Sequence, residues 1–564
     1  MNRAERRRQE KQQAKRSPAG SSQARSIVEQ AKQAHQAGHL QQAEALYRSA
    51  LSLAPAHPEA MHYLGLLHYR LGRLEQALPL LTEACRLDPV NSLYWFNAGV
   101  VAQRAGKADD AVRFYRQALA INPRHLDASV NLGNALKELG RLDEAEQAYN
   151  EVLRTSPDHV ETLNNLGVLY KERGQVERAV ASYRRAIALK PDHAEALNNL
   201  GLIYMDQGRL DEAIDCYEQA LRAQPGYLTA TYNLGMAALW AGQPDRALAC
   251  FTRTAHAKHD HGRPARDTVV YRSRLKHDVE QLDYLSNTGL VGPELQSYRD
   301  ALNRLRSSLD SQGDKANRRA VSPDELQPIA PSFNRLVHVA SCERVAEGAV
   351  NPDVDVAGVE ARYHARRPEV TFVDDLLRPE ALDRLRRFCW ESTIWKKDYE
   401  NGYVGAFLGD GFATPLLLQV ADELRRTFPN IFGSHPLTQA WAFKHDSARR
   451  GLNIHADAAA VNVNFWITPD EANLDPASGG LVVWNKEAPR EWNFKDYNSD
   501  ANRGKIYDWL EQSGAEAIKI PYRSNRAVIF NSDLFHETDE ISFKEGYTNR
   551  RINITLLYGY RHRD

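Results

Sequence analysis

Between about residues 24 and 261, apolar positions recur at helical spacing inside a unit that repeats every 34 residues. Each unit carries a small residue in its first helix and an alanine in its second, which lets two antiparallel helices approach closely. A proline such as Pro89 or Pro123 closes most units, because proline cannot continue a helix. The pattern predicts seven helical hairpins that stack into one array.

The repeating unit resembles the tetratricopeptide repeat, which implies an all-α superhelix with a concave surface. The small residue of the first helix recurs at Gly65, Gly99, Gly133, Gly167, Gly201 and Gly235. An aromatic residue or a leucine follows the alanine of the second helix, as at Tyr115 and Leu81, and the aromatic is predicted to fill the groove between units.

A row of asparagines lies in register on the first helices. Its members, the asparagine ladder, are Asn97, Asn131, Asn165, Asn199 and Asn233. Asparagine is a poor helix former, so five in register need a reason. The row resembles the ladder of O-linked N-acetylglucosamine transferase, which implies amides that hold an extended peptide by its backbone. The alternative is that these amides bridge neighbouring helices. Tyr63 interrupts the row and predicts a shorter groove.

The segments that flank the array differ in composition and in predicted secondary structure. Residues 1–23 are basic and polar and are predicted to be a disordered tail. Residues 262–310 show helical periodicity and are expected to cap the open end of the array. Residues 311–365 look like an extended connector. From 366 to 564, helices come first and short β-branched or aromatic segments follow, which predicts an α+β domain built on a sandwich or barrel.

Three potential metal ligands lie in that last domain. His455 and Asp457 are one residue apart near a strand, and His536 follows an apolar strand. Two imidazoles and one carboxylate leave three coordination positions open, which suits non-haem Fe(II), although zinc also accepts such ligands. Arg550 and Arg551 then open the strand RINITLLYG.

This order of motifs over about 366–562 resembles the Fe(II)/2-oxoglutarate oxygenases, especially the prolyl-hydroxylase and phytanoyl-hydroxylase-like branches. The resemblance implies a double-stranded β-helix, or jelly roll, in which His455, Asp457 and His536 hold Fe(II). It also implies that 2-oxoglutarate and O2 take the open positions and that a substrate is hydroxylated.

Side chains alternate between the two faces of a strand, and this alternation distinguishes the two arginines. Arg551, Asn553 and Thr555 share one face of the strand, so we predict that Arg551 binds the distal carboxylate of oxoglutarate, with Thr555 or Asn553 assisting. Arg550 is the reserve candidate, and a surface position for Arg551 is the alternative.

Other positions are left open by the sequence. The aromatic-rich insertion at about 484–520 either closes over the substrate or packs against a sheet edge. Trp441 and Lys444, before the His-x-Asp pair, and Asn462 and Asn464, after it, are candidates to face the pocket, but parity alone does not decide which do.

Charge and cysteine content restrict the expected binding partners and the expected cellular compartment. With 72 basic and 73 acidic residues the net charge is -1, which predicts neither nucleic-acid nor membrane binding. The five cysteines form no CxxC pair, which favours a reducing, cytoplasmic compartment.

We therefore predict an Fe(II)- and 2-oxoglutarate-dependent dioxygenase that hydroxylates a protein or peptide recruited by the repeats. One alternative is a scaffold with a sensory or inactive oxygenase domain. Another is a small-molecule hydroxylase whose repeats serve for localisation.

Overall fold

The computed structural model describes residues 18–259, 269–311, 317–365, 367–399, 402–433, 435–449, 454–489, 491–492, 494–498 and 502–560. Two compact units divide the chain, Met1–Ile203 and Tyr204–Asp564. The boundary falls inside a helix of the sixth repeat, so the last repeat belongs to the unit that holds the C-terminal domain.

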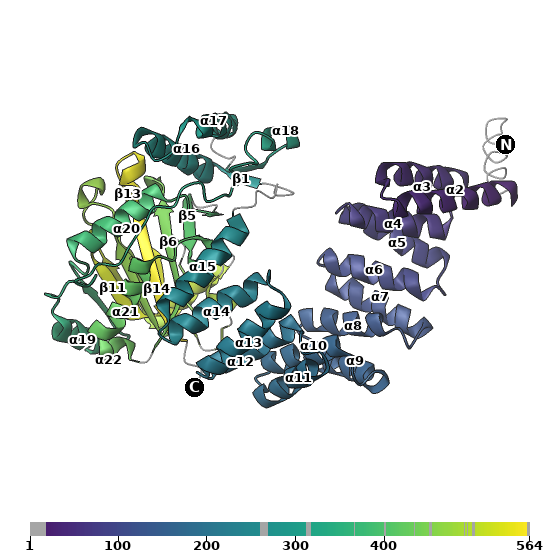
Figure 1. Ribbon diagram of the computed structural model, residues 1–564, viewed down its shortest axis with the longest axis horizontal. Helices are drawn as coiled ribbons and strands as arrows, with labels where there is room; N and C mark the ends of the chain where they lie inside the picture. Colours follow the sequence, from purple (N-terminus) through teal and green to yellow (C-terminus); the bar gives the residue numbers. More distant parts are fainter. Residues whose placement is uncertain are drawn as a thin grey trace. The chain divides into compact units, whose positions relative to one another are not determined.

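The first unit is built from helix pairs (Figure 1). Its helices are α2 (Pro18–Gln36), α3 (Leu40–Leu53), α4 (Pro58–Arg70), α5 (Leu74–Leu87), α6 (Ser92–Arg104), α7 (Ala108–Ile121), α8 (Leu126–Glu138), α9 (Leu142–Thr155), α10 (Val160–Glu172), α11 (Val176–Leu189) and the start of α12 (Ala194–Asp206). The predicted hairpins are confirmed.

Close helix contact explains the recurring glycines. A Cβ atom on Gly99 would lie 2.5 Å from Cε1 of Tyr115, and Tyr115 is fully buried. The aromatic ring therefore occupies the space that the missing side chain leaves. Between the helices of this pair, Gly106 adopts φ 71°, a left-handed conformation that favours glycine and ends α6.

The second unit begins with the remaining repeat helices, α13 (Leu210–Ala223), α14 (Leu228–Trp240) and α15 (Pro244–His259). They rest directly on the C-terminal domain. The Trp240 indole donates a 2.7 Å hydrogen bond to the carbonyl of Leu437, and Nε2 of His259 lies 3.0 Å from Oδ1 of Asp410.

The segment predicted to cap the array packs against the C-terminal domain. It contains β1 (Val269–Tyr271), α16 (Arg272–Asn287) and α17 (Gln296–Asp310). Helix α16 contacts β5 (Tyr403–Phe407) and α20 (Pro379–Glu391), and its Glu280 forms an ion pair with Arg550. The capping role itself stays a prediction. The connector is also more structured than predicted, with β2 (Arg318–Ala320), α18 (Pro323–Leu326) and α19 (Val356–His364).

The C-terminal region is rich in antiparallel sheet, as predicted. The remaining strands are β3 (Val370–Val373), β4 (Lys397–Asp398), β6 (Leu437–His445), β7 (Ala448–Arg449), β8 (Val461–Trp466), β9 (Leu481–Glu487), β10 (Ala517–Ile520), β11 (Ala527–Asn531), β12 (Leu534–Thr538), β13 (Ile541–Ser542) and β14 (Ile552–Tyr558). A seven-stranded sheet has the order β3-β11-β8-β14-β6-β5-β4, a second sheet β10-β9-β12, and β13 pairs with β7.

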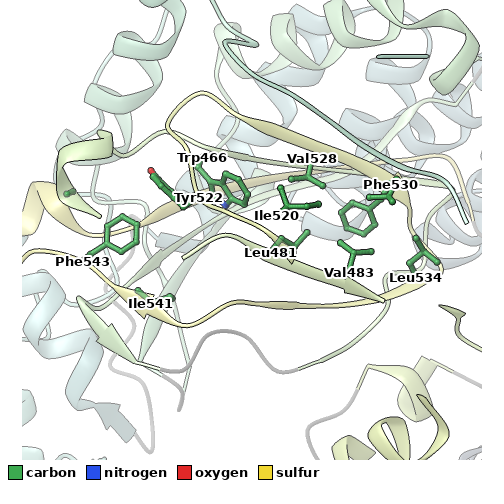
Figure 2. Close-up of a cluster of buried hydrophobic side chains, with 12 residues drawn as sticks. Trp466, Leu481, Val483, Ile520, Tyr522, Val528, Phe530, Leu534, Ile541 and Phe543 are labelled. Carbon is green, nitrogen blue, oxygen red and sulfur yellow. The ribbon is translucent and has the colours of Figure 1, made fainter. Parts of the chain in front are cut away.

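The main core of this region lies between the first two sheets. Figure 2 shows Trp466, Val528 and Phe530 of the larger sheet directed toward Leu481 and Val483 of the smaller one. Residues on the inner and outer faces alternate along each strand. Helices α20 and α21 (Pro415–Thr427) cover the outer face, with α22 (Pro429–Phe432) following α21 (Figure 1).

Candidate metal centre

Three predicted ligands come together between the two sheets. One ligand atom from each of His455, Asp457 and His536 lies within 4.8 Å of the other two. Nε2 of His536 is 3.4 Å from Oδ2 of Asp457, and Nε2 of His455 is 3.8 Å from Oδ1. Ligands with bonds of about 2.1 Å to one ion lie roughly 3 to 3.5 Å apart. The cluster therefore fits a single divalent cation after small shifts.

Backbone pairing brings these distant residues together. His455 donates its N–H to the carbonyl of His536 over 3.0 Å, and His536 donates back over 2.8 Å. The N–H of Asp457 is bound by the carbonyl of Ser532. The strand-like spacing directs His455 and Asp457 to one side and Ala456 to the other.

The ligand side chains are oriented before any ion binds. Nδ1 of His536 donates to the carbonyl of Leu534 at 3.0 Å, which leaves Nε2 directed at Asp457. Nδ2 of Asn462 donates to Oδ2 of Asp457 at 2.7 Å. Burial raises the pKa of Asp457, but the hydrogen bond with His536, the charge of His455 and the Asn462 bond outweigh burial, so its pKa lies below the ordinary value. The carboxylate is thus kept as an anion.

A row of buried polar side chains continues from Asp457 across the inner face of the sheet. Asn462 accepts from Asn464 at 2.6 Å, and Oδ1 of Asn464 accepts from Asn553 at 2.8 Å and Thr555 at 2.9 Å. Each of these side chains is at most 4% exposed. Oδ1 of Asn553 has no hydrogen-bond partner among the described residues. We call this set the polar row.

Arg551 precedes β14 and shares the face of Asn553. It is 1% exposed, so a surface position for this residue is wrong. Its Nε and Nη2 donate to the carbonyls of Gly479 at 2.6 Å and Gly480 at 3.2 Å. Nη1 has no partner, and Arg551 forms no ion pair within the part of the chain that the structure describes. Burial lowers its pKa to about 10, so it remains a cation at neutral pH.

Arg550 points away and is already neutralised. Its Nε and Nη2 each lie 2.8 Å from Oε2 of Glu280 on α16, and Nη1 lies 3.6 Å from Oδ1 of Asp446. Among the described residues, Arg551 is thus the buried guanidinium of this pair without an ion pair, and Asp539 acts on it only from a longer distance.

The structure shows which of the remaining candidate side chains face the inner side of the sheet. Trp441 pairs with Thr555 across β6 and β14, and Asn464 pairs with Thr555 across β8 and β14, so all three share the inner face. Lys444 lies on the outer face, where it donates to the carbonyl of Cys389 and the hydroxyl of Tyr547 at 2.8 Å each. Lys444 therefore lies outside the candidate site.

Aromatic rings continue the inner face beyond the polar row. Trp441 and Phe443 pack at 6.2 Å between ring centroids, and Phe407 contacts both. Tyr403 stacks on buried His445 at 5.1 Å. Burial, then the charge of Arg551, lowers the pKa of His445 well below its ordinary value. Sequence reasoning had named only Trp441 among these rings.

The insertion packs against the ligand-bearing segments. It contains α23 (Phe494–Tyr497) and α24 (Arg503–Gln512). Its aromatics Trp492 and Trp509 lie 6.1 Å and 5.7 Å from the ring of Phe535, beside His536. These contacts correspond to the packing role predicted for the aromatic residues of the insertion, rather than to closure over a substrate.

The asparagine ladder is half-buried at all five positions. In the first unit, all four of its amides reach the preceding repeat. Asn97 donates to His62 at 2.8 Å, Asn165 to Asn134 at 3.2 Å, and Asn199 to Asn164 at 3.1 Å. Asn131 hydrogen-bonds Tyr115. Asn233 belongs to the second unit. The bridging alternative is thus realised at the ladder positions of the first unit.

Comparisons with known proteins bear on the first half of the chain. One tetratricopeptide repeat model matches residues 28–92 and 164–227, and another matches 102–166 and 204–266. The N-terminal region of about 260 residues therefore consists of tetratricopeptide repeats. No curated protein matches the chain. Every helix among the described residues is too short or too polar to traverse a bilayer.

Solved repeat structures are also similar. A tetratricopeptide repeat protein from Parabacteroides merdae has 21% identity, covers 41% of this chain and 91% of its own, and gives a TM-score of 0.37. YrrB, described as a TPR protein with an unusual peptide-binding site, has 20% identity, covers 33% and 95%, and gives 0.28. Pseudomonas aeruginosa pilF has 21% identity, covers 35% and 90%, and gives 0.32. Scores this low carry no argument about function.

Proposed function

We propose that the C-terminal domain is an Fe(II)- and 2-oxoglutarate-dependent dioxygenase with a double-stranded β-helix fold. The observation that carries the proposal is Arg551, a buried guanidinium without an acidic partner, on the sheet face that leads through the polar row to Asp457. A buried cation in this state calls for an anionic ligand.

The residues fit the two groups. His455, Asp457 and His536 would hold Fe(II), since two imidazoles and one carboxylate are the ligands of non-haem iron oxygenases. Arg551 would pair with the distal carboxylate of oxoglutarate, because guanidinium binds carboxylate with two parallel hydrogen bonds. Thr555 and Asn553 flank that position on the same face. With both groups bound, oxoglutarate and O2 would be converted to succinate and CO2 as one oxygen atom enters a substrate C–H bond.

The protein's own contribution is orientation and exclusion of water. Asn462 holds one oxygen of Asp457 and leaves the other directed toward His455. The Leu534 carbonyl fixes the ring of His536. The aromatic wall of Trp441, Phe443 and Phe407 lines the inner face beside the polar row and supplies an apolar surface for the substrate.

We propose that the substrate is a protein segment bound by the repeats. Support comes from the half-buried asparagine ladder, because an amide offers both donors and an acceptor to a peptide backbone, and from the tetratricopeptide matches themselves. A scaffold role rests on the same repeats and needs no chemistry at the metal cluster. We further propose a reducing, cytoplasmic setting, with which five free cysteines agree.

Anaerobic titration tests the metal and cosubstrate together. Fe(II) and oxoglutarate added to the purified chain should produce a weak visible charge-transfer band. His455→Ala should abolish the band, and His364→Ala, at an exposed histidine outside the cluster, should leave it unchanged. A wild-type protein that binds Fe(II) without developing the band in saturating oxoglutarate would contradict the dioxygenase proposal.

A further inference from the structure

Both ligand-bearing segments have a second buried face that does not contact the metal cluster. Ile454 and Ala456 are 2% and 0% exposed and alternate with His455 and Asp457. They share an apolar cluster with Tyr497, Ile506 and Leu510 of the insertion. The insertion therefore packs on the back of the His-x-Asp pair.

Two hydrogen bonds from the insertion hold the residue between those ligands. The N–H of Ala456 donates to the carbonyl of Tyr497 at 3.1 Å, and Nδ2 of Asn498 donates to the carbonyl of Ala456 at 2.9 Å. Both backbone polar groups of Ala456 are thus bound by consecutive residues of the insertion. Because Ala456 joins His455 to Asp457, its orientation sets how those two side chains converge.

The other ligand segment is held from the same side. Phe535, before His536, is fully buried and contacts Trp492 and Trp509. Glu537, after His536, accepts a 2.6 Å hydrogen bond from the hydroxyl of Tyr507 on α24. Alternation directs Phe535 and Glu537 toward the insertion while His536 faces Asp457.

We infer that the insertion is a clamp that presets the metal site, with Asn498 and Tyr507 as positioning residues. The inference rests on the proposed metal site and extends it to a segment distant from the ligands in sequence. Held backbones lose less conformational freedom when the ion binds, so the clamp raises metal affinity. Linkage makes the effect reciprocal, and metal binding stabilises the insertion.

The test measures Mn(II) binding to the full-length chain by electron paramagnetic resonance, where the signal of free Mn(II) falls as the ion binds. Asn498→Ala should weaken binding about tenfold. Tyr507→Phe should weaken it severalfold, and Asn498→Gln, which keeps an amide donor, should recover part of the loss. Asn351→Ala is the matched control, because Asn351 also donates from its amide to a backbone carbonyl, that of Asp375, at 3.0 Å.

Hydrogen exchange supplies a readout that a merely structural role would not change. Mn(II) should slow amide exchange in 503–512 of the wild-type chain, and less so in Asn498→Ala. Wild-type affinity and unchanged exchange in Asn498→Ala would overturn the clamp. If that variant does not fold, wild-type affinity in Tyr507→Phe overturns it instead. A wild-type chain that binds no Mn(II) would remove the metal site itself, a different failure.

Discussion

Replacing Arg551 by methionine separates the ligand-binding role of this residue from any role in stability. Burial lowers the pKa of Arg551 from 12.5 to about 10. At about 1.4 kcal/mol per pH unit, the buried charge costs roughly 3 kcal/mol in the ligand-free protein. Methionine removes that cost but leaves the carbonyls of Gly479 and Gly480 without their donor. Each unsatisfied carbonyl destabilises the folded protein by about 1 to 3 kcal/mol. The opposing effects nearly cancel, so the thermal midpoint without ligand should change little.

Oxoglutarate binding should respond in the opposite way. Loss of one partner from a buried charge pair costs about 2 to 5 kcal/mol, so affinity should fall roughly 30-fold or more. Isothermal titration with oxoglutarate, with Mn(II) in the metal site, measures this loss, and Mn(II) affinity without oxoglutarate should stay near wild type.

The neighbouring arginine is the control. Arg550→Met would leave Glu280 without its ion-pair partner, whereas Asp446 keeps Lys276 at 2.8 Å. The variant should therefore lower stability by about 3 kcal/mol, with a smaller effect on oxoglutarate binding. The reasoning is refuted if Arg551→Met binds oxoglutarate as the wild type does, or if it destabilises the ligand-free protein as much as Arg550→Met.

Three further outcomes follow from the same geometry. Asn462→Ala removes a hydrogen bond that lowers the pKa of Asp457 in the folded protein. The stability that this carboxylate contributes is present above its pKa in the unfolded chain and is lost as the pH falls through its pKa in the folded protein. Acid unfolding of the variant, followed by circular dichroism, should therefore begin at a higher pH than in the wild type. Gly99→Ala should destabilise the array by about 1 to 3 kcal/mol in thermal unfolding, since the new methyl group overlaps the ring of Tyr115; an unchanged midpoint would contradict the packing argument. Alanine at all five positions of the asparagine ladder should reduce crosslinking of peptide partners to the chain while the metal-site band survives, and unchanged crosslinking would exclude the ladder as the peptide site.

The sequence predicted those features of the protein that depend on residues close together in the chain. The seven repeats were readable because the glycine of the first helix meets a large side chain of the same hairpin at a fixed separation in sequence. This side chain is Tyr115 for Gly99 and Leu81 for Gly65. Of the segment 262–310, the sequence correctly predicted helix at Arg272–Asn287 and Gln296–Asp310, but not what these helices pack against. Periodicity reports that a face is apolar, not which distant surface covers it.

The sequence by itself determined the repeat array, the α+β character of the C-terminal region and the identity of the residues now grouped as His455, Asp457 and His536. Only the tertiary structure decided that Arg550 is neutralised by Glu280 and that Arg551 is not. It also decided that Asn462 holds Asp457 and that the insertion binds Ala456 from behind. The physical reason is the same in each case. Burial and ion pairing depend on segments that are far apart in the chain and meet only after folding, so no local pattern records them.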